Sequence, residues 1–177
     1  MKKILVTGAT GQIGTGLTPA LRARYGGTNV IAAGHRREPP ASVREQGPFV
    51  RADVTHRAEL EQIVAEHRID AIFHLASLLS ADAEKKPQRA WEVNMGGLMN
   101  VLDIARMHQC AVFFPSSIGA FGPSTPQENT PQDTIQRPNT MYGITKISGE
   151  LLCDYYHQRF GLDTRGVRYP GLISYET

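Results

Sequence analysis

The sequence predicts an α/β fold in which a doubly wound parallel sheet carries helices on both faces. Three observations predict it: short apolar segments recur along the chain, segments with helical periodicity lie between them, and a glycine-rich stretch directly follows the first apolar segment. Strands that are almost continuously apolar and alternate with helices form a parallel sheet covered on both sides. The length of 177 residues fits one domain with one good core.

Six segments have the short, β-branched and aromatic composition of strands. They are "KILVT" (3–7), "NVIAA" (29–33), "PFVRA" (48–52), "DAIFHLA" (70–76), "AVFFPSS" (111–117) and "TRGVRYPG" (164–171). Periodic apolar residues predict four helices, at residues 12–25, 57–67, 88–108 and 142–160. Residues 121–140 are rich in Pro, Asn and Thr without periodicity, and a loop of that length inside a domain is usually functional or disordered. Because it leads directly into Tyr142, we expect it to be functional.

Composition argues against several classes of function. The net charge is +2 with both signs interspersed, so no nucleic-acid partner is expected. The apolar runs are too short for a membrane span or a signal peptide. Cys110 and Cys153 stand far apart and outside any CxxC, which predicts packed, reduced thiols in a cytoplasmic protein. The histidines show no HExxH spacing, so no metal site is expected, and His74 is predicted to be a hydrogen-bonded core residue.

A glycine motif, "VTGATGQIG", separates the first predicted strand from the first predicted helix. Gly8 allows a tight turn, Gly11 lets a pyrophosphate approach the backbone, and Gly14 lets the helix pack closely on the strand. The N–H groups that open the helix, at Gln12 and Ile13, and the helix dipole then hold the anion. In this strand–loop–helix context the motif predicts a Rossmann fold that binds a dinucleotide.

The second predicted strand lacks the acid that would hold the adenosine ribose of NAD, because Gly34 stands at its end. Two interpretations remain open. Arg36 and Arg37 bind the 2′-phosphate of NADP, or they are solvated charges and the ribose of NAD makes backbone contacts. Asp53, after the third strand, is a candidate for an adenine contact, although we expect Thr55 to cap the following helix.

Tyr142 and Lys146 lie four residues apart in a predicted helix and therefore share one helix face. An ammonium close to a phenol lowers the pKa of the phenol toward neutrality, which makes Tyr142 a candidate general base. Ser116 and Ser117 end a strand, where open α/β sheets bind ligands, and supply a hydroxyl that orients the substrate oxygen. The alternative is a packed tyrosine, a solvated lysine and a serine turn, and the glycine motif favours the catalytic interpretation.

The segments "TGATGQIG", "HLAS", "FPSSIGAFG", "YGITK" and "RYPG", in this order and spacing, resemble those of extended short-chain dehydrogenases/reductases. More narrowly, "LASLLSA", "PSSIGAFGP", "TPQDTIQRPNTMYGITK" and "RYPGLISY" resemble the short-chain-type L-threonine 3-dehydrogenases. The resemblance covers essentially the whole chain. The segments 121–146 and 168–175 are specific to the narrower family.

The resemblance implies oxidation of L-threonine to 2-amino-3-ketobutyrate with reduction of NAD. Tyr142 would take the hydroxyl proton, Lys146 would lower its pKa and hold the nicotinamide ribose, and Ser117 would orient the hydroxyl. Ser80 matches a family position near the substrate. The helices at 88–108 and 142–160 would pair in a homodimer. Asn94 would support the active site from the helix at 88–108. The remaining implied cofactor contacts are Asp53, Val54, Leu75, Ala76, Asn94, Tyr169 and Pro170.

Two departures from the family pattern shape these expectations. Family members usually carry an acid where Gly34 stands, which keeps NADP open beside NAD. Extended members also continue beyond "RYPGLISY" into a C-terminal substrate domain, so residues 1–177 are expected to be the dinucleotide-binding domain with most of the substrate domain missing. The alternatives are a sugar-nucleotide epimerase or dehydratase on the same scaffold, and a cofactor-binding fragment without catalysis.

Overall fold

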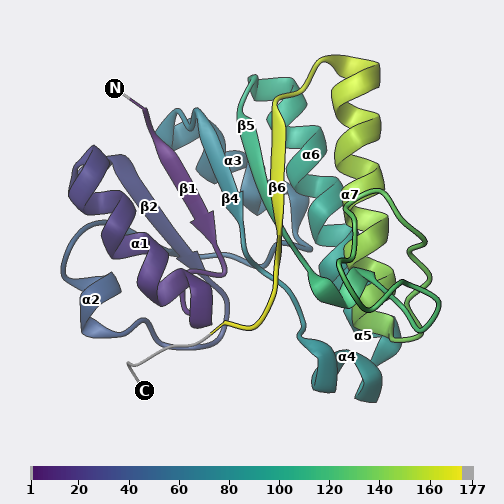
Figure 1. Ribbon diagram of the computed structural model, residues 1–177. Helices are drawn as coiled ribbons and strands as arrows, with labels where there is room; N and C mark the ends of the chain where they lie inside the picture. Colours follow the sequence, from purple (N-terminus) through teal and green to yellow (C-terminus); the bar gives the residue numbers. More distant parts are fainter. Residues whose placement is uncertain (1, 173–177) are drawn as a thin grey trace.

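Residues 2–172, which the computed structural model describes, contain one parallel sheet of six strands in the order β3-β2-β1-β4-β5-β6 (Figure 1). The strands are β1 (Ile4–Thr7), β2 (Val30–Gly34), β3 (Phe49–Arg51), β4 (Ala71–His74), β5 (Ala111–Ser117) and β6 (Thr164–Tyr169). β1 is central, and its Ile4 pairs with Val30 of β2 on one side and Ala71 of β4 on the other. The chain thus winds outward in both directions from β1, as predicted, and ligands of such sheets bind where the order reverses.

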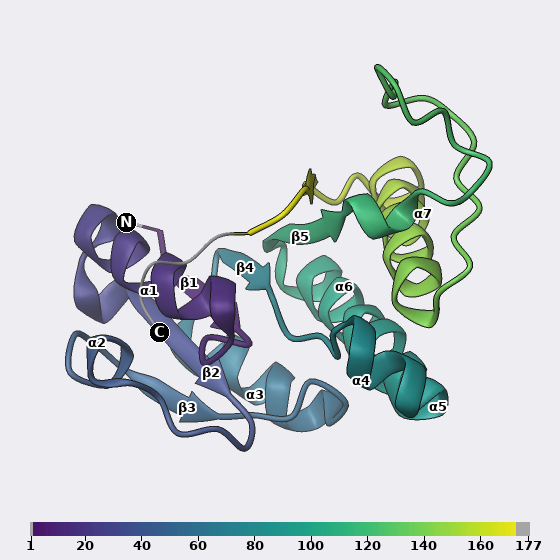
Figure 2. The same cartoon turned by 60° about the horizontal axis from the view of Figure 1, so that its bottom comes forward.

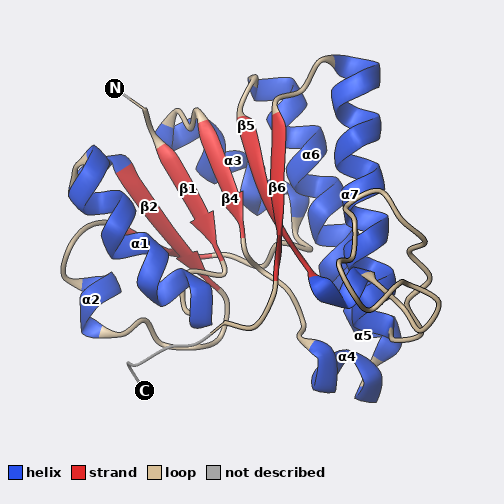
Figure 3. Cartoon of the chain, in the orientation of Figure 1, coloured by secondary structure: helices blue, strands red, loops and turns tan. Residues whose placement is uncertain are grey.

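Helices cover both faces of the sheet (Figure 3). They are α1 (Gln12–Tyr25), α2 (Ala41–Arg44), α3 (Arg57–His67), α4 (Ser80–Lys85), α5 (Pro87–Trp91), α6 (Gly97–His108) and α7 (Met141–Phe160). α1 and α2 pack on one face through Leu21 and Val43, which join Val6 in one buried cluster. On the opposite face α3, α6 and α7 form the larger core, which includes Leu102 and Phe114. The Rossmann architecture predicted from the sequence is confirmed.

Several boundaries differ from the prediction. The helix expected at 88–108 consists of α5, a π-helical turn (Glu92–Gly96) and α6. α2 and α4 were not predicted, because four and six residues are too few to show a helical period. The predicted reduced thiols are confirmed: Cys110 and Cys153 are both free and buried.

The segment 121–140 contains no helix or strand, as expected, and projects past α7 (Figure 2). It folds back on itself through Thr125, whose Oγ1 accepts from the N–H of Gly122 at 3.0 Å and donates to the carbonyl of Ile135 at 2.6 Å. Its last residue, Thr140, is the N-cap of α7, and its Oγ1 accepts from the N–H of Gly143 at 3.1 Å. The loop therefore sets where α7 begins, one residue before Tyr142.

None of the helices within residues 2–172 combines the length and the apolar character that a membrane crossing requires. Residues 173–175, which complete the "RYPGLISY" segment, lie outside the described part of the chain.

Candidate cofactor and active site

The glycine motif forms a tight turn at the carboxyl end of β1. Gly8 adopts φ +68°, and a Cβ atom there would lie 2.6 Å from the backbone nitrogen of Ala76. A Cβ atom on Gly14 would lie 2.6 Å from the Cα atom of Ala9. α1 begins at Gln12 with Gly11 as N-cap, and no described side chain caps it. Its first N–H groups are therefore available to an anion, and the cradle fits the pyrophosphate of a dinucleotide.

A cavity of about 670 Å³ runs from this turn across the carboxyl ends of β2, β3 and β4. Most of the predicted cofactor residues line it: Gly8, Gly11, Gln12, Arg36, Asp53, Val54, Leu75 and Ala76. The other predicted cofactor residues, Ile13, Gly14, Asn94, Tyr142, Lys146, Tyr169 and Pro170, are not part of its lining. The cavity therefore corresponds to the adenosine and pyrophosphate end of the predicted site.

Asp53 is held by its neighbours at this end. Its Oδ1 accepts from the N–H and the Oγ1 of Thr55, at 3.0 and 2.8 Å. Its Oδ2 lies 3.4 Å from both His35 Nε2 and Arg89 Nη2. Burial raises the pKa of Asp53, but the Thr55 hydrogen bonds and the electrostatic effects of His35 and Arg89 outweigh it and hold the pKa below its ordinary value. The carboxylate is therefore charged and already engaged.

The expectation that Thr55 caps the next helix is wrong. α3 begins at Arg57 and its N-cap is His56, without a side-chain capping bond. Thr55 is instead drawn into the turn by Asp53, and a hydroxyl engaged there is not positioned to cap the helix.

Ser117, Tyr142 and Lys146 meet where β5 ends and α7 begins. Gly119 lies against both Ser117 and Tyr142, because a Cβ atom on Gly119 would lie 3.4 Å from Ser117 Oγ and 3.4 Å from Tyr142 Cδ1. Lys146 Nζ lies 5.3 Å from the centre of the Tyr142 ring and donates to the carbonyl of Pro115 at 2.8 Å. The structure thus brings the three predicted catalytic side chains together at one strand end.

The predicted effect of Lys146 on Tyr142 is not what the structure shows. The pKa of Tyr142 is raised, because burial disfavours the phenolate more than the hydrogen bond with Ser117 favours it. Lys146 directs its ammonium toward the Pro115 carbonyl and the ring of Tyr142. The shared helix face was predicted correctly, but the direction of the pKa shift was wrong.

The pKa of Lys146 is itself strongly shifted. Only 5% of the residue is exposed, and burial lowers its pKa to about 8, although Glu150 acts in the opposite direction. His74, at the end of β4, is 2% exposed and its Nδ1 lies 2.9 Å from Thr7 Oγ1, which confirms the predicted core histidine. Burial and the charge of Lys146 lower the pKa of His74 to about 3, so it is neutral beside the lysine.

The depressed pKa of Lys146 predicts a pH-dependent stability. Between about pH 8 and pH 10.5 the unfolded chain binds more protons than the folded one, so the free energy of unfolding should rise with pH. Below this window the burial penalty is fully present. We would measure urea unfolding of the wild type and of Lys146→Met across this range. The free energy of unfolding of the wild type should rise relative to that of the variant by about 1 kcal/mol per pH unit. A difference in unfolding free energy that does not change with pH would contradict the lowered pKa of Lys146.

Asn94 links the turn after β4 to α7. It lies in the π-helical turn, and its Oδ1 accepts from the N–H of Leu78 at 2.7 Å. Its Nδ2 donates to the carbonyl of Leu78 at 3.1 Å and to Thr145 Oγ1 at 3.0 Å. Thr145 Oγ1 in turn donates to the carbonyl of Tyr142 at 2.8 Å. Through these contacts Asn94 fixes the turn after β4 relative to the first turn of α7.

The other predicted residues surround the same strand ends. Ser80 is the exposed first residue of α4. α4 is tied to the start of α7 because Glu84 Oε1 accepts from the N–H of Met141 at 2.6 Å. Tyr169 ends β6 and pairs in register with Ser117, and Pro170 follows it. The predicted substrate and nicotinamide contacts therefore lie on elements that converge on Ser117.

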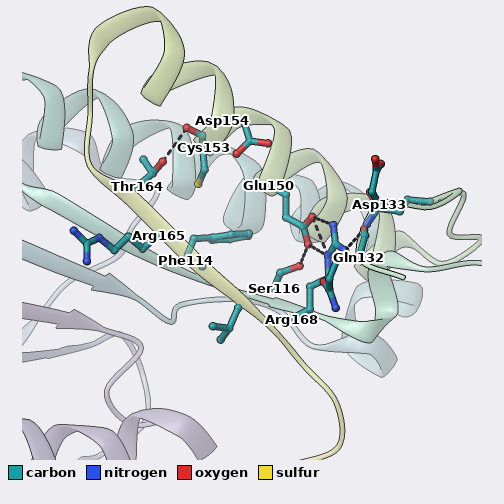
Figure 4. Close-up of a pocket in the computed structure, with 13 residues that line it drawn as sticks. Phe114, Ser116, Gln132, Asp133, Glu150, Cys153, Asp154, Thr164, Arg165 and Arg168 are labelled. Carbon is teal, nitrogen blue, oxygen red and sulfur yellow. Dashed lines mark hydrogen bonds and ion pairs between the residues drawn. The ribbon is translucent and has the colours of Figure 1, made fainter. Parts of the chain in front are cut away.

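One polar network near the site was not predicted. Glu150 accepts from Arg168 Nη2 at 2.6 Å and from the hydroxyl of Ser116, and Arg168 Nη1 donates to the carbonyl of Gln132 at 2.9 Å (Figure 4). The network lines a second cavity of about 710 Å³ between α7, β6 and the 121–140 loop. It ties the loop to the scaffold. The available sequence signal was the position of Glu150, one helical turn after Lys146.

Comparison with known proteins places this geometry in context. The profile of the NAD dependent epimerase/dehydratase family matches residues 4–177. An uncharacterized epimerase/dehydratase of Staphylococcus epidermidis is 58% identical over 175 residues, which are 99% of this chain and 55% of the relative. The chain therefore spans little more than half the length of that relative.

Solved structures of similar proteins have the same fold. An L-threonine dehydrogenase from Clostridium difficile is 59% identical, with a TM-score of 0.96 over 100% of this chain and 56% of that protein. A monomeric L-threonine 3-dehydrogenase from a metagenome is 46% identical, with a TM-score of 0.93 over 98% of this chain and 55% of that protein. A UDP-glucose 4-epimerase from Brucella ovis in complex with NAD is 26% identical, with a TM-score of 0.86 over 97% of this chain and 52% of that protein.

Proposed function

The chain belongs to the NAD dependent epimerase/dehydratase family, and from this premise we propose that it oxidises the 3-hydroxyl of L-threonine to 2-amino-3-ketobutyrate. The observation that carries the proposal is the meeting of Ser117, Tyr142 and Lys146 at one strand end, beside a cavity built for a dinucleotide. The high identity to L-threonine dehydrogenases supports this substrate over a sugar nucleotide.

The proposed reaction divides into a proton transfer and a hydride transfer. A bound oxidised nicotinamide would supply the acceptor for the hydride that leaves the β-carbon of threonine. Ser117 donates a hydrogen bond to the substrate oxygen and orients it. Tyr142 takes the hydroxyl proton as a phenolate, and Lys146, whose Nζ lies 5.3 Å from the centre of the Tyr142 ring, holds the nicotinamide ribose beside it. The carbon loses two electrons and becomes a ketone, and the proton passes from Tyr142 to solvent.

The proposal assigns the other residues by their place in the fold. Residues 1–177 are the dinucleotide-binding domain, with Tyr169 and Pro170 beside the nicotinamide end and Ser80 beside the substrate. Gly8, Gly11, Gln12, Ile13 and Gly14 hold the pyrophosphate through the turn and the first N–H groups of α1. The proposed cofactor is a nicotinamide dinucleotide, which the family name and the NAD bound to the related epimerase support.

Threonine-driven reduction of the cofactor tests the proposal. We would follow absorbance of the reduced nicotinamide with this chain, and with a chimera that adds the part of the C. difficile enzyme beyond the matched region. L-Threonine should drive net reduction, whereas D-threonine should not. A cofactor that is held tightly and never reduced by threonine would favour the epimerase alternative. Cofactor binding without turnover of either substrate class would favour a binding module.

We also propose a homodimer through the helices at 88–108 and 142–160. Large apolar side chains remain exposed on α6 and α7, with exposed fractions of 50% for Met107, 61% for Leu151 and 53% for Tyr155. Patches of this kind mark protein interfaces. Light scattering should give twice the mass of one chain, and Leu151→Asp should shift it to one chain. A wild-type mass of one chain, as in the monomeric relative from the metagenome, would contradict the proposal.

A cytoplasmic location completes the proposal. Cys110 and Cys153 are free and buried, and burial raises their pKa values to about 11 and about 12, so neither is a reactive thiolate. Inert, reduced thiols are typical of proteins from reducing compartments. Cell fractionation measures the location directly.

A further inference from the structure

The adenosine end of the cavity has no room for the acid that usually holds the ribose of NAD. Gly34 ends β2, where that acid would stand. A Cβ atom on Gly34 would lie 2.9 Å from Thr10 Cγ2 and 3.0 Å from Phe49 Cζ. Any side chain at this position therefore needs its neighbours to move. A carboxylate side chain at position 34 would therefore not fit the present packing of Thr10 and Phe49.

The acids that follow β2 and β3, Glu38 and Asp53, are already engaged. Glu38 pairs with Arg51 on the outside of the turn that follows β2. Asp53 accepts two hydrogen bonds from Thr55, and His35 and Arg89 lie beside its second oxygen. Neither carboxylate is thus positioned as an uncommitted acceptor for the two hydroxyls of an adenosine ribose.

Two guanidinium groups follow the end of β2. Arg36 and Arg37, two and three residues after Gly34, line the cavity, and both are exposed. Arg37 Nη1 donates to the carbonyl of Thr10 at 3.3 Å, which holds its guanidinium against the phosphate loop. Arg36 has no hydrogen bond or ion pair with any residue in the range 2–172. A planar guanidinium binds a phosphate through two parallel hydrogen bonds, and an unpaired one is ready to do so.

We infer that Arg36 and Arg37 form a phosphate-monoester subsite that recognises the 2′-phosphate of NADP, so that NADP binds this chain more tightly than NAD. The inference rests on the proposed dinucleotide binding and adds the chemical identity of the cofactor at its adenosine end. A 2′-phosphate on the ribose would meet Arg36 first, with Arg37 as the second, anchored donor.

Calorimetric titration of the 177-residue chain with NADP and NAD tests the inference without any turnover. The fragments 2′,5′-ADP and 5′-AMP repeat the comparison for the adenosine half alone. We expect NADP and 2′,5′-ADP to bind about tenfold or more tightly than their unphosphorylated counterparts, as a charge-assisted hydrogen bond implies. Arg36→Ala should remove most of this preference and leave NAD affinity within about twofold. Arg24→Ala, an exposed arginine of α1 outside the cavity lining, is the matched control and should change neither.

Three other results would overturn the inference. Equal or tighter binding of NAD would mean that the two arginines do not select a phosphate. An equal loss of NAD and NADP affinity in Arg36→Ala would mean that the charge acts on the pyrophosphate. Binding of neither dinucleotide would overturn this subsite together with the dinucleotide site. By contrast, tight NADP binding with no oxidation of threonine by NADP or NAD would leave the subsite standing and contradict the proposed function alone.

Discussion

Replacing Tyr142 with Phe should reduce the turnover of L-threonine by about a thousandfold while leaving dinucleotide affinity unchanged. The substitution removes only the oxygen that accepts the substrate proton, and general-base catalysis contributes about 10² to 10⁴ to such rates. The ring keeps its place over Lys146 and beside Gly119, so the strand end keeps its shape. Steady-state kinetics on the form of the protein that oxidises threonine gives kcat, and titration of the same sample gives cofactor affinity.

Tyr155→Phe is the matched control for this experiment. Tyr155 lies on the same helix and loses the same oxygen, but its side chain packs edge-on against Tyr156 and Phe160 and is 53% exposed. Its turnover should equal that of the wild type. The pH profile adds a second test: because the pKa of Tyr142 is raised, wild-type kcat/KM should climb with pH as the phenol ionises, and the climb should vanish in Tyr142→Phe. A Tyr142→Phe protein with an undiminished rate would contradict the assigned mechanism.

The parts of the site that the sequence predicted are those fixed by local backbone chemistry. Gly8 needs φ +68° and a close approach to Ala76, and a glycine after a strand and before a helix indicates this directly. The shared face of Tyr142 and Lys146 follows from their spacing of four residues. The order of strands and helices followed from apolar periodicity, which depends on burial alone.

The parts that the sequence did not predict depend on how distant elements are paired. The register of β6 against β5 places Arg168 opposite Ser116, and only this pairing brings Glu150 within reach of both. Asn94, which lies in a π-helical turn, donates to Thr145, and Thr145 donates to the carbonyl of Tyr142. No spacing rule in one sequence reports such contacts.

The prediction that the pKa of Tyr142 is lowered was wrong for a related reason. The prediction placed an ammonium near a phenol and assumed that the charge acts on the oxygen. In the fold Lys146 reaches the carbonyl of Pro115, and the phenol is half-buried. Burial then decides the direction of the shift. A side chain's partner, and not its position on the helix, determined the electrostatic outcome.

Gly14→Ala should abolish dinucleotide binding and lower the free energy of unfolding by about 1 to 3 kcal/mol, the usual cost of overpacking. The added methyl group would lie 2.6 Å from the Cα atom of Ala9 and close to the carbonyl oxygen of Gly8. Both are backbone atoms of the turn, so relief requires α1 to move away from β1. That movement displaces the N–H groups of the first helical turn from the pyrophosphate, which joins the loss of binding to the loss of stability.

Gly16→Ala provides the control within the same helix. Gly16 is exposed, and a Cβ atom there would have no atom within 4 Å. Alanine should therefore stabilise α1 by about 0.5 to 1 kcal/mol through helix propensity, with unchanged dinucleotide affinity. Urea unfolding and calorimetric titration of both variants measure the two effects separately. If Gly14→Ala bound the dinucleotide as the wild type does, close packing of the helix on the strand would not be what forms the phosphate site, and the anion would have to be held elsewhere in the cavity.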